Sequence, residues 1–91
     1  MRRAAKRDAN EAAIVAALER IGCVVRRLNQ DGLPDLLVAC RGMWTAMEVK
    51  EPGGKLTRAQ AKLMRLAPFP VVHSVDEALQ FLERSRVWER P

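Results

Sequence analysis

Two carboxylates and a lysine stand at positions where a pair of β-strands would bring them together. Asp35 begins one apolar run, and Glu48 and Lys50 end the next, with Arg41-Gly42 as the short break between the runs. This pattern predicts a β-hairpin with a two-residue loop. In that register Asp35 faces Glu48, with Cβ atoms about 5 Å apart on one face of the sheet. Lys50, two residues beyond Glu48, lies on the same face.

Facing carboxylates repel each other and destabilise a strand pair unless a cation lies between them. Oxygen ligands of this kind suit Mg²⁺ or Mn²⁺. Lys50 beside such an ion is suited to activating a water molecule or to stabilising the charge of a reacting phosphate. A register shifted by one residue would put Asp35 and Glu48 on opposite faces, so the interpretation depends on the turn.

The order of the helices and strands expected around these residues predicts an α/β fold with a small mixed sheet flanked by helices. Both faces of the hairpin are largely apolar, as in a sheet with helices on both sides. A short strand after the second helix is expected to join the hairpin as a parallel crossover. The expected elements are helices over 8–21, 57–66 and 75–85 and strands over 23–29, 34–40, 43–50 and 70–73.

The three helices are predicted from apolar spacing and from their first residues. Capping-box pairs, Thr57 with Gln60 and Ser74 with Glu77, open the second and third helices. Apolar residues at helical spacing predict the first helix. The residues expected to pack inward from the second helix are Leu63, Met64 and Leu66.

The chain of 91 residues is long enough for one small domain and carries a formal net charge of +5. This charge favours an anionic partner, of which nucleic acid is the commonest, although a merely soluble basic protein has the same composition. Residues 1–7 form a basic arm that could contact phosphates. No apolar run reaches membrane-span length and no stretch resembles a signal peptide, so we expect a cytoplasmic protein of a bacterial or virus-infected cell.

The two cysteines, Cys23 and Cys40, each lie in an apolar run. We expect them to be buried, unpaired thiols in a reducing compartment. A zinc site is not expected, because only His73 is available to join them.

The roles of four further residues are considered separately. Glu11 lies on the apolar stripe of the first helix, either as a first-turn acid favoured by the helix dipole or as a third acid directed toward the metal. Gln60 fits a cap of its own helix. His73 is a possible general base but is more typical of a structural residue. Trp88 fits the core, a base-stacking surface or a dimer contact.

Basic and flexible residues near the acids are candidates for DNA contact. Arg26 and Arg27 alternate along the first strand, so at least one of them can face substrate. Gly53, Gly54 and Lys55 follow the acidic strand and would let a phosphate backbone approach closely. This loop lacks the form of a P-loop.

Several of these motifs together resemble one nuclease family. The matching residues are Gly32-x-Pro34-Asp35-Leu36, Glu48-Val49-Lys50, Pro52-Gly53-Gly54-x-Leu56 and Gln60. Their joint spacing is similar to that of the VRR-NUC (virus-type replication-repair nuclease) family of the PD-(D/E)xK superfamily. The resemblance implies a restriction-endonuclease-like fold with a three-layer core over residues 1–91.

The resemblance also implies roles for individual residues. Asp35 and Glu48 would be side-chain ligands of Mg²⁺ or Mn²⁺, and the carbonyl of Val49 would be a further ligand. Lys50 would position or deprotonate the attacking water. The remaining two implied members of the site are Glu11, which would support the metal, and Gln60, which would hold the lysine or the water.

The resemblance implies a metal-dependent endonuclease that acts on DNA. Stand-alone viral members of the family act on branched or four-way DNA as homodimers, so the same substrates and assembly are implied here. The main alternative is a non-catalytic, basic nucleic-acid-binding module on the same fold. In a third reading the chain is an interaction protein in which Asp35 and Glu48 pair with Arg26 or Arg27.

Overall fold

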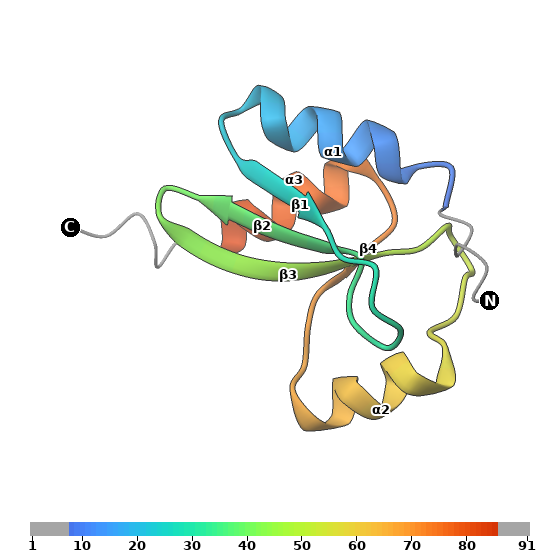
Figure 1. Cartoon of the computed structure of the whole chain (residues 1–91). Coiled ribbons are helices and arrows are strands. Elements are labelled where there is room, and N and C mark those ends of the chain that lie inside the picture. Colours follow the sequence, from blue (N-terminus) through green and yellow to red (C-terminus); the bar gives the residue numbers. More distant parts are fainter. Residues whose placement is uncertain (1–7, 86–91) are drawn as a thin grey trace.

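The elements expected from the sequence are all present in the computed structural model, which describes residues 8–85 (Figure 1). The predicted basic arm of residues 1–7 and Trp88 lie outside the described residues. An α/β fold with a four-stranded mixed sheet and three helices is confirmed. The elements are α1 (Glu11–Arg20), β1 (Val24–Arg27), β2 (Leu36–Cys40), β3 (Met43–Val49), α2 (Arg58–Leu66), β4 (Val71–Val72) and α3 (Val75–Arg84).

The hairpin formed by β2 and β3 has the predicted register. Arg41 and Gly42 form its two-residue loop with φ angles of 54° and 82°, and a tight turn of this kind needs positive φ at both residues. Cys40 therefore pairs with Met43. The same register continues to the open end of the hairpin, where Asp35 and Glu48 lie opposite each other.

The strand order in the sheet is β1-β2-β3-β4. The first three strands pair in an antiparallel manner, whereas β4 is parallel to β3, with Glu48 opposite Val71. A parallel pair needs a crossover connection, and α2 lies within it. The predicted parallel strand is thus confirmed.

Helices α1 and α3 cover one face of the sheet, and α2 lies on the other side (Figure 1). The face under α1 and α3 holds the hydrophobic core, because every second residue of β2 points into it. Fully buried members of this core include Ile14, Leu18, Leu36, Val38, Met47 and Val49.

The second face is covered only near its acidic end. Gln60 is the one buried residue of α2. A Cβ atom at Gly32 would lie 3.2 Å from Ala59 Cβ, so the helix packs against the loop before β2. Trp44 near the hairpin tip is 58% exposed and Leu66 at the end of α2 is 78% exposed. The expectation that Leu66 packs inward is wrong, because the last residue of α2 is exposed, whereas Leu63 and Met64 are half-buried.

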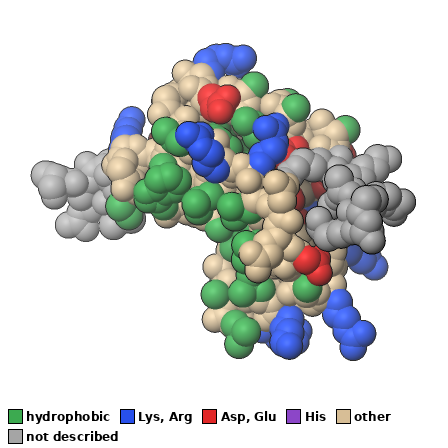
Figure 2. Space-filling model, viewed as in Figure 1, with side chains coloured by type: hydrophobic (Ala, Val, Ile, Leu, Met, Phe, Trp, Pro, Cys, Tyr) green, Lys and Arg blue, Asp and Glu red, His purple; other side chains and the backbone are tan. Residues whose placement is uncertain are grey.

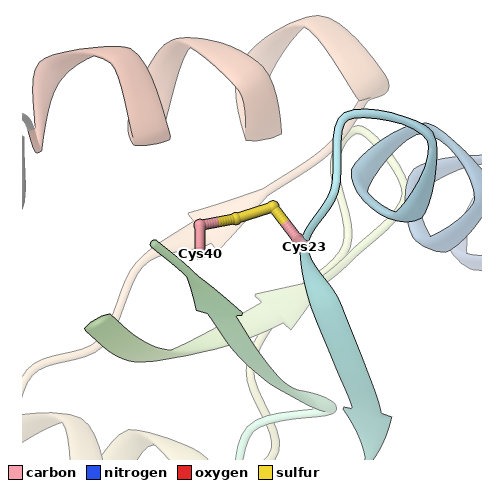
Figure 3. The surroundings of a disulfide bond; sticks show 2 residues. All are labelled: Cys23 and Cys40. Atoms are coloured by element: carbon pink, nitrogen blue, oxygen red, sulfur yellow. A yellow bond between two sulfur atoms is a disulfide. The ribbon is translucent and has the colours of Figure 1, made fainter. Parts of the chain in front are cut away.

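The expectation of unpaired thiols is also wrong. Figure 3 shows a disulfide between Cys23, just before β1, and Cys40, at the end of β2. Val24 pairs with Ala39, so the two cysteines form the next opposed pair, with Cα atoms 4.6 Å apart. The separation is that of directly opposed residues in an antiparallel ladder, and it suits a disulfide. The argument for a reducing compartment from these cysteines therefore no longer holds.

Within residues 8–85, no helix is long and apolar enough to cross a membrane.

Candidate active site

Asp35 and Glu48 are held together by the two strands that carry them. The backbone N–H of Asp35 donates a hydrogen bond to Glu48 Oε1 at 3.1 Å. In return, the backbone N–H of Val49 donates to Asp35 Oδ2 at 3.0 Å. Each carboxylate is thus fixed by the backbone of the opposite strand, and the predicted meeting of the two acids across the hairpin is confirmed.

The carboxylate of Glu48 is almost fully enclosed, with 1% of the residue exposed. Its Oε2 atom accepts a hydrogen bond from Gln60 Nε2 at 3.0 Å and lies 3.3 Å from Lys50 Nζ. The Lys50 side chain is 16% exposed, so it is itself partly enclosed beside the buried acid. The predicted placement of Lys50 next to the acids is confirmed.

Burial and the negative charge of Asp35 raise the pKa of Glu48 to about 7, against the opposing effects of Lys50 and Gln60. Two negative charges this close are unfavourable in a buried site without a compensating cation. Lys50 supplies one such positive charge, and the carboxylate oxygens of Asp35 and Glu48 are of the type that Mg²⁺ and Mn²⁺ prefer.

Gln60 caps its own helix, as its sequence position predicts, and its side chain also reaches the site, where it contacts Glu48 rather than Lys50. Its amide oxygen accepts a hydrogen bond from the backbone N–H of Thr57 at 3.0 Å, and its own backbone N–H donates to Thr57 Oγ1 at 3.1 Å. These bonds form the predicted capping box. The amide nitrogen remains available and donates to Glu48. The cap thus orients the side chain that holds the acid.

Glu11 does not join the other two acids. Its carboxylate is buried, and Oε2 lies 2.8 Å from Arg27 Nε. Among residues 8–85, no group of three or more His, Cys, Asp or Glu side chains is arranged to hold a metal ion. The geometry therefore does not support Glu11 as a ligand beside Asp35 and Glu48, and it places this acid in an ion pair instead.

The same ion pair shows on which face of the sheet Arg27 lies. Arg27 pairs in register with Leu36, whose side chain lies in the core, so Arg27 is on the α1 face rather than on the acids' face. Arg26 is in register with Leu37 and shares the acids' face. It is exposed, and its guanidinium donates to the carbonyl of Val25 at 3.0 Å. Arg26 therefore remains a candidate for DNA contact.

The loop after Lys50 turns sharply at its two glycines. Gly53 has a φ of 84°, and the N–H of Gly54 donates to the carbonyl of Glu51 at 2.8 Å. A Cβ atom at Gly54 would lie 3.0 Å from that carbonyl oxygen, a contact tighter than most side chains make. Lys55 is exposed beside this turn. The close backbone approach expected of these glycines serves the fold of the loop itself.

Asn10 is a supporting residue that the sequence analysis missed. Its Nδ2 atom donates to the carbonyls of Lys50 and His73 at 3.2 and 2.8 Å, and its backbone N–H donates to Glu51 Oε2 at 3.2 Å. The residue precedes α1, where Asn is typical of a helix cap, but its side chain makes no capping bond. It instead ties the start of α1 to the strand end that carries Lys50.

His73 has a local role in the structure. Its Nδ1 atom lies 2.9 Å from Glu77 Oε1, and its backbone N–H donates to the same oxygen at 2.8 Å. Hydrogen bonding from His73 lowers the pKa of Glu77. Ser74 caps α3 through Glu77 N–H, whereas the Glu77 side chain binds His73 instead of completing the predicted capping box.

No family model matches this chain, and no curated protein and no solved structure matches it either. The resemblance to VRR-NUC nucleases therefore stays a prediction based on the motif residues. The structure adds that four of those residues, Asp35, Glu48, Lys50 and Gln60, lie in one place.

Proposed function

We propose that this chain is a metal-dependent endonuclease that hydrolyses phosphodiester bonds in DNA. The observation that carries the proposal is Lys50 Nζ, 3.3 Å from the buried carboxylate of Glu48, with Asp35 fixed against the same carboxylate. The order of helices and strands and the VRR-NUC motif residues support a restriction-endonuclease-like fold.

In this proposal Asp35, Glu48 and the carbonyl of Val49 hold Mg²⁺ or Mn²⁺. Such an ion, when bound, would supply polarisation of a phosphoryl oxygen and a lower pKa for a bound water. Gln60 keeps the Glu48 carboxylate oriented, and Lys50 presents a positive charge to the phosphate or to the water. The Asn10 amide fixes the backbone of Lys50 and thereby the origin of its side chain.

A preference for branched or four-way DNA and a homodimeric assembly belong to the same proposal and rest on the family resemblance. A two-fold dimer would present two sites to symmetric strands of a junction. Light scattering with and without a four-way junction tests this assembly, and a monomer under both conditions contradicts it.

A non-catalytic DNA-binding module is the second candidate, and one observation favours it. Glu48 already has hydrogen-bonding or ion-pair partners in Lys50, Gln60 and the backbone of Asp35 without a metal ion. In that case the acids stabilise the fold, and the net charge of +5 provides DNA affinity. The third reading is not supported at Glu48, whose ion pair is with Lys50 and not with an arginine.

The experiment that separates the two candidates is a cleavage assay on linear, flapped and four-way DNA in Mg²⁺, in Mn²⁺ and in EDTA. The nuclease proposal predicts cleavage with either metal and none in EDTA. DNA binding of equal strength under all three conditions, without cleavage of any substrate, supports the binding module.

A further inference from the structure

Helix α2 differs in charge from the other two helices. It contains three basic residues and no acidic residue, whereas α1 and α3 each contain more acidic than basic residues. The basic residues of α2 are Arg58, Lys62 and Arg65.

These three side chains are exposed, and none of them forms an ion pair with the part of the chain that the structure describes. Figure 2 shows Lys and Arg side chains gathered at the lower end of the molecule, where α2 lies. Like charges at spacings of three and four residues destabilise a helix. Packing holds the other side of the helix, where Gln60 is buried and Leu63 and Met64 are half-buried, and leaves the three positive charges uncompensated. This concentration of positive charge on α2 favours an anionic partner.

The spacing of the three cations matches a repeating anion. Residues 58, 62 and 65 fall within about 60° around the helix and span about 10 Å along its axis, from 3.6 residues per turn and 1.5 Å per residue. One strand of a DNA duplex carries a phosphate about every 3.4 Å along its axis. The stripe is therefore long enough to follow about three nucleotide steps of one strand.

The stripe lies on the side of α2 away from Gln60, which points to Glu48, so it is about one helix diameter, roughly 10 Å, from the acids. Phosphates bound there are not the ones that react. Lys55, exposed in the loop between β3 and α2, continues the positive charge from the site toward the helix. The surface suits a duplex that extends past the site.

We propose that the stripe formed by Arg58, Lys62 and Arg65 on α2 is a second DNA-contact surface, which binds the phosphate backbone of duplex DNA away from the cleaved bond. This inference rests on the proposed DNA-directed function. It adds which part of the DNA substrate the stripe binds. The contacts are independent of base sequence, because they involve phosphates alone.

The test compares two triple variants with the same net charge. Arg58→Gln/Lys62→Gln/Arg65→Gln removes the stripe, and Arg20→Gln/Arg41→Gln/Arg84→Gln removes three exposed cations elsewhere. Each variant lowers the formal net charge from +5 by three, to +2. Glutamine keeps helix propensity close to that of the basic residues. Circular dichroism checks the fold, and the single variants Arg58→Gln and Lys62→Gln provide the measurement if a triple variant does not fold.

Affinity for a 20-base-pair duplex is measured by fluorescence anisotropy in EDTA over a range of salt concentrations. Three lost phosphate contacts reduce the slope of log K against log salt by about 2.7, at about 0.9 per contact, and a single variant reduces it by about 0.9. The control triple variant is expected to change the slope by less than one. Equal slopes for the two triple variants overturn the inference.

The same proteins separate this inference from the nuclease proposal. A reduced salt-dependence slope in the stripe variant, with no cleavage by the wild type in Mg²⁺ or Mn²⁺, supports the stripe as a DNA-contact surface and contradicts the nuclease proposal. Cleavage by the wild type, with equal slopes for both triple variants, supports the nuclease and overturns the stripe.

Discussion

The carboxylate of Glu48 accepts a hydrogen bond from the backbone N–H of Asp35, the residue opposite it across the hairpin, at 3.1 Å. This bond links two acids of like charge through the backbone of one of them. Because the partner is a backbone group, a change in the Asp35 side chain leaves the bond in place. A substitution of the Asp35 side chain therefore removes its charge without removing this bond to Glu48.

Asp35→Asn is expected to abolish Mn²⁺ binding and to lower cleavage on the order of a thousandfold, since a charged oxygen ligand is replaced by a neutral amide. Calorimetry with Mn²⁺ and the cleavage rate are the two measurements. Asp31→Asn, a change of the same kind in the exposed turn before β2, is the control and should leave both unchanged. Retained Mn²⁺ binding by Asp35→Asn would show that the metal site is misplaced.

Gln60→Ala is expected to destabilise the protein more than Thr57→Ala. The Thr57 variant loses only the cap, which costs about 1 kcal/mol. The Gln60 variant keeps the capping bond to Thr57 Oγ1, because its donor is the backbone N–H of residue 60. It loses the reciprocal bond from Thr57 N–H and the amide bond to the buried carboxylate, and the second loss costs about 1.5–3 kcal/mol. Urea unfolding of both variants measures the difference, and equal losses would show that the bond to Glu48 contributes nothing.

Stability is expected to fall as pH rises from about 4.5 to about 7. The pKa of Glu48 is raised to about 7 in the folded state from 4.5, so in this interval the folded protein binds more protons than the unfolded chain. The shift of about 2.5 units corresponds to roughly 3 kcal/mol. Urea unfolding between pH 5 and pH 8 measures it. Glu48→Gln should remove this part of the pH dependence, and an unchanged profile in that variant would contradict the assignment.

Reduction of the Cys23–Cys40 disulfide is expected to lower the free energy of unfolding by about 3 kcal/mol, since the bond closes a loop with a sequence separation of 17. Thermal unfolding with and without reductant gives the shift, and thiol titration gives the oxidation state. Two titratable thiols in the protein prepared without reductant would contradict the disulfide.

The sequence was most informative where local rules decide the structure. The Arg41-Gly42 turn set the register that brings Asp35 and Glu48 together, and the capping pattern placed Gln60 at the third position of α2. Both features follow from residues close to one another in the chain. The sequence therefore predicted that Asp35, Glu48, Lys50 and Gln60 lie together, but not that Glu11 lies apart from them.

The features that were missed depend on contacts between distant segments. The disulfide requires the register of β1 against β2, and no short turn sets it. The pair formed by Glu11 and Arg27 depends on how α1 lies across β1. Asn10 is of a residue type typical of a helix cap. Its side chain instead donates hydrogen bonds to backbone carbonyls just after β3 and β4.

Cleavage by Lys50→Ala in Mg²⁺ is the most direct test of the account, because the amine lies beside the acids without being a metal ligand. Arg20→Ala, an exposed cation at the end of α1, is the matched control for contaminating nuclease. The account predicts that Lys50→Ala binds DNA like the wild type but no longer cleaves it, whereas Arg20→Ala does both. Cleavage by Lys50→Ala at the wild-type rate would contradict the proposed active site.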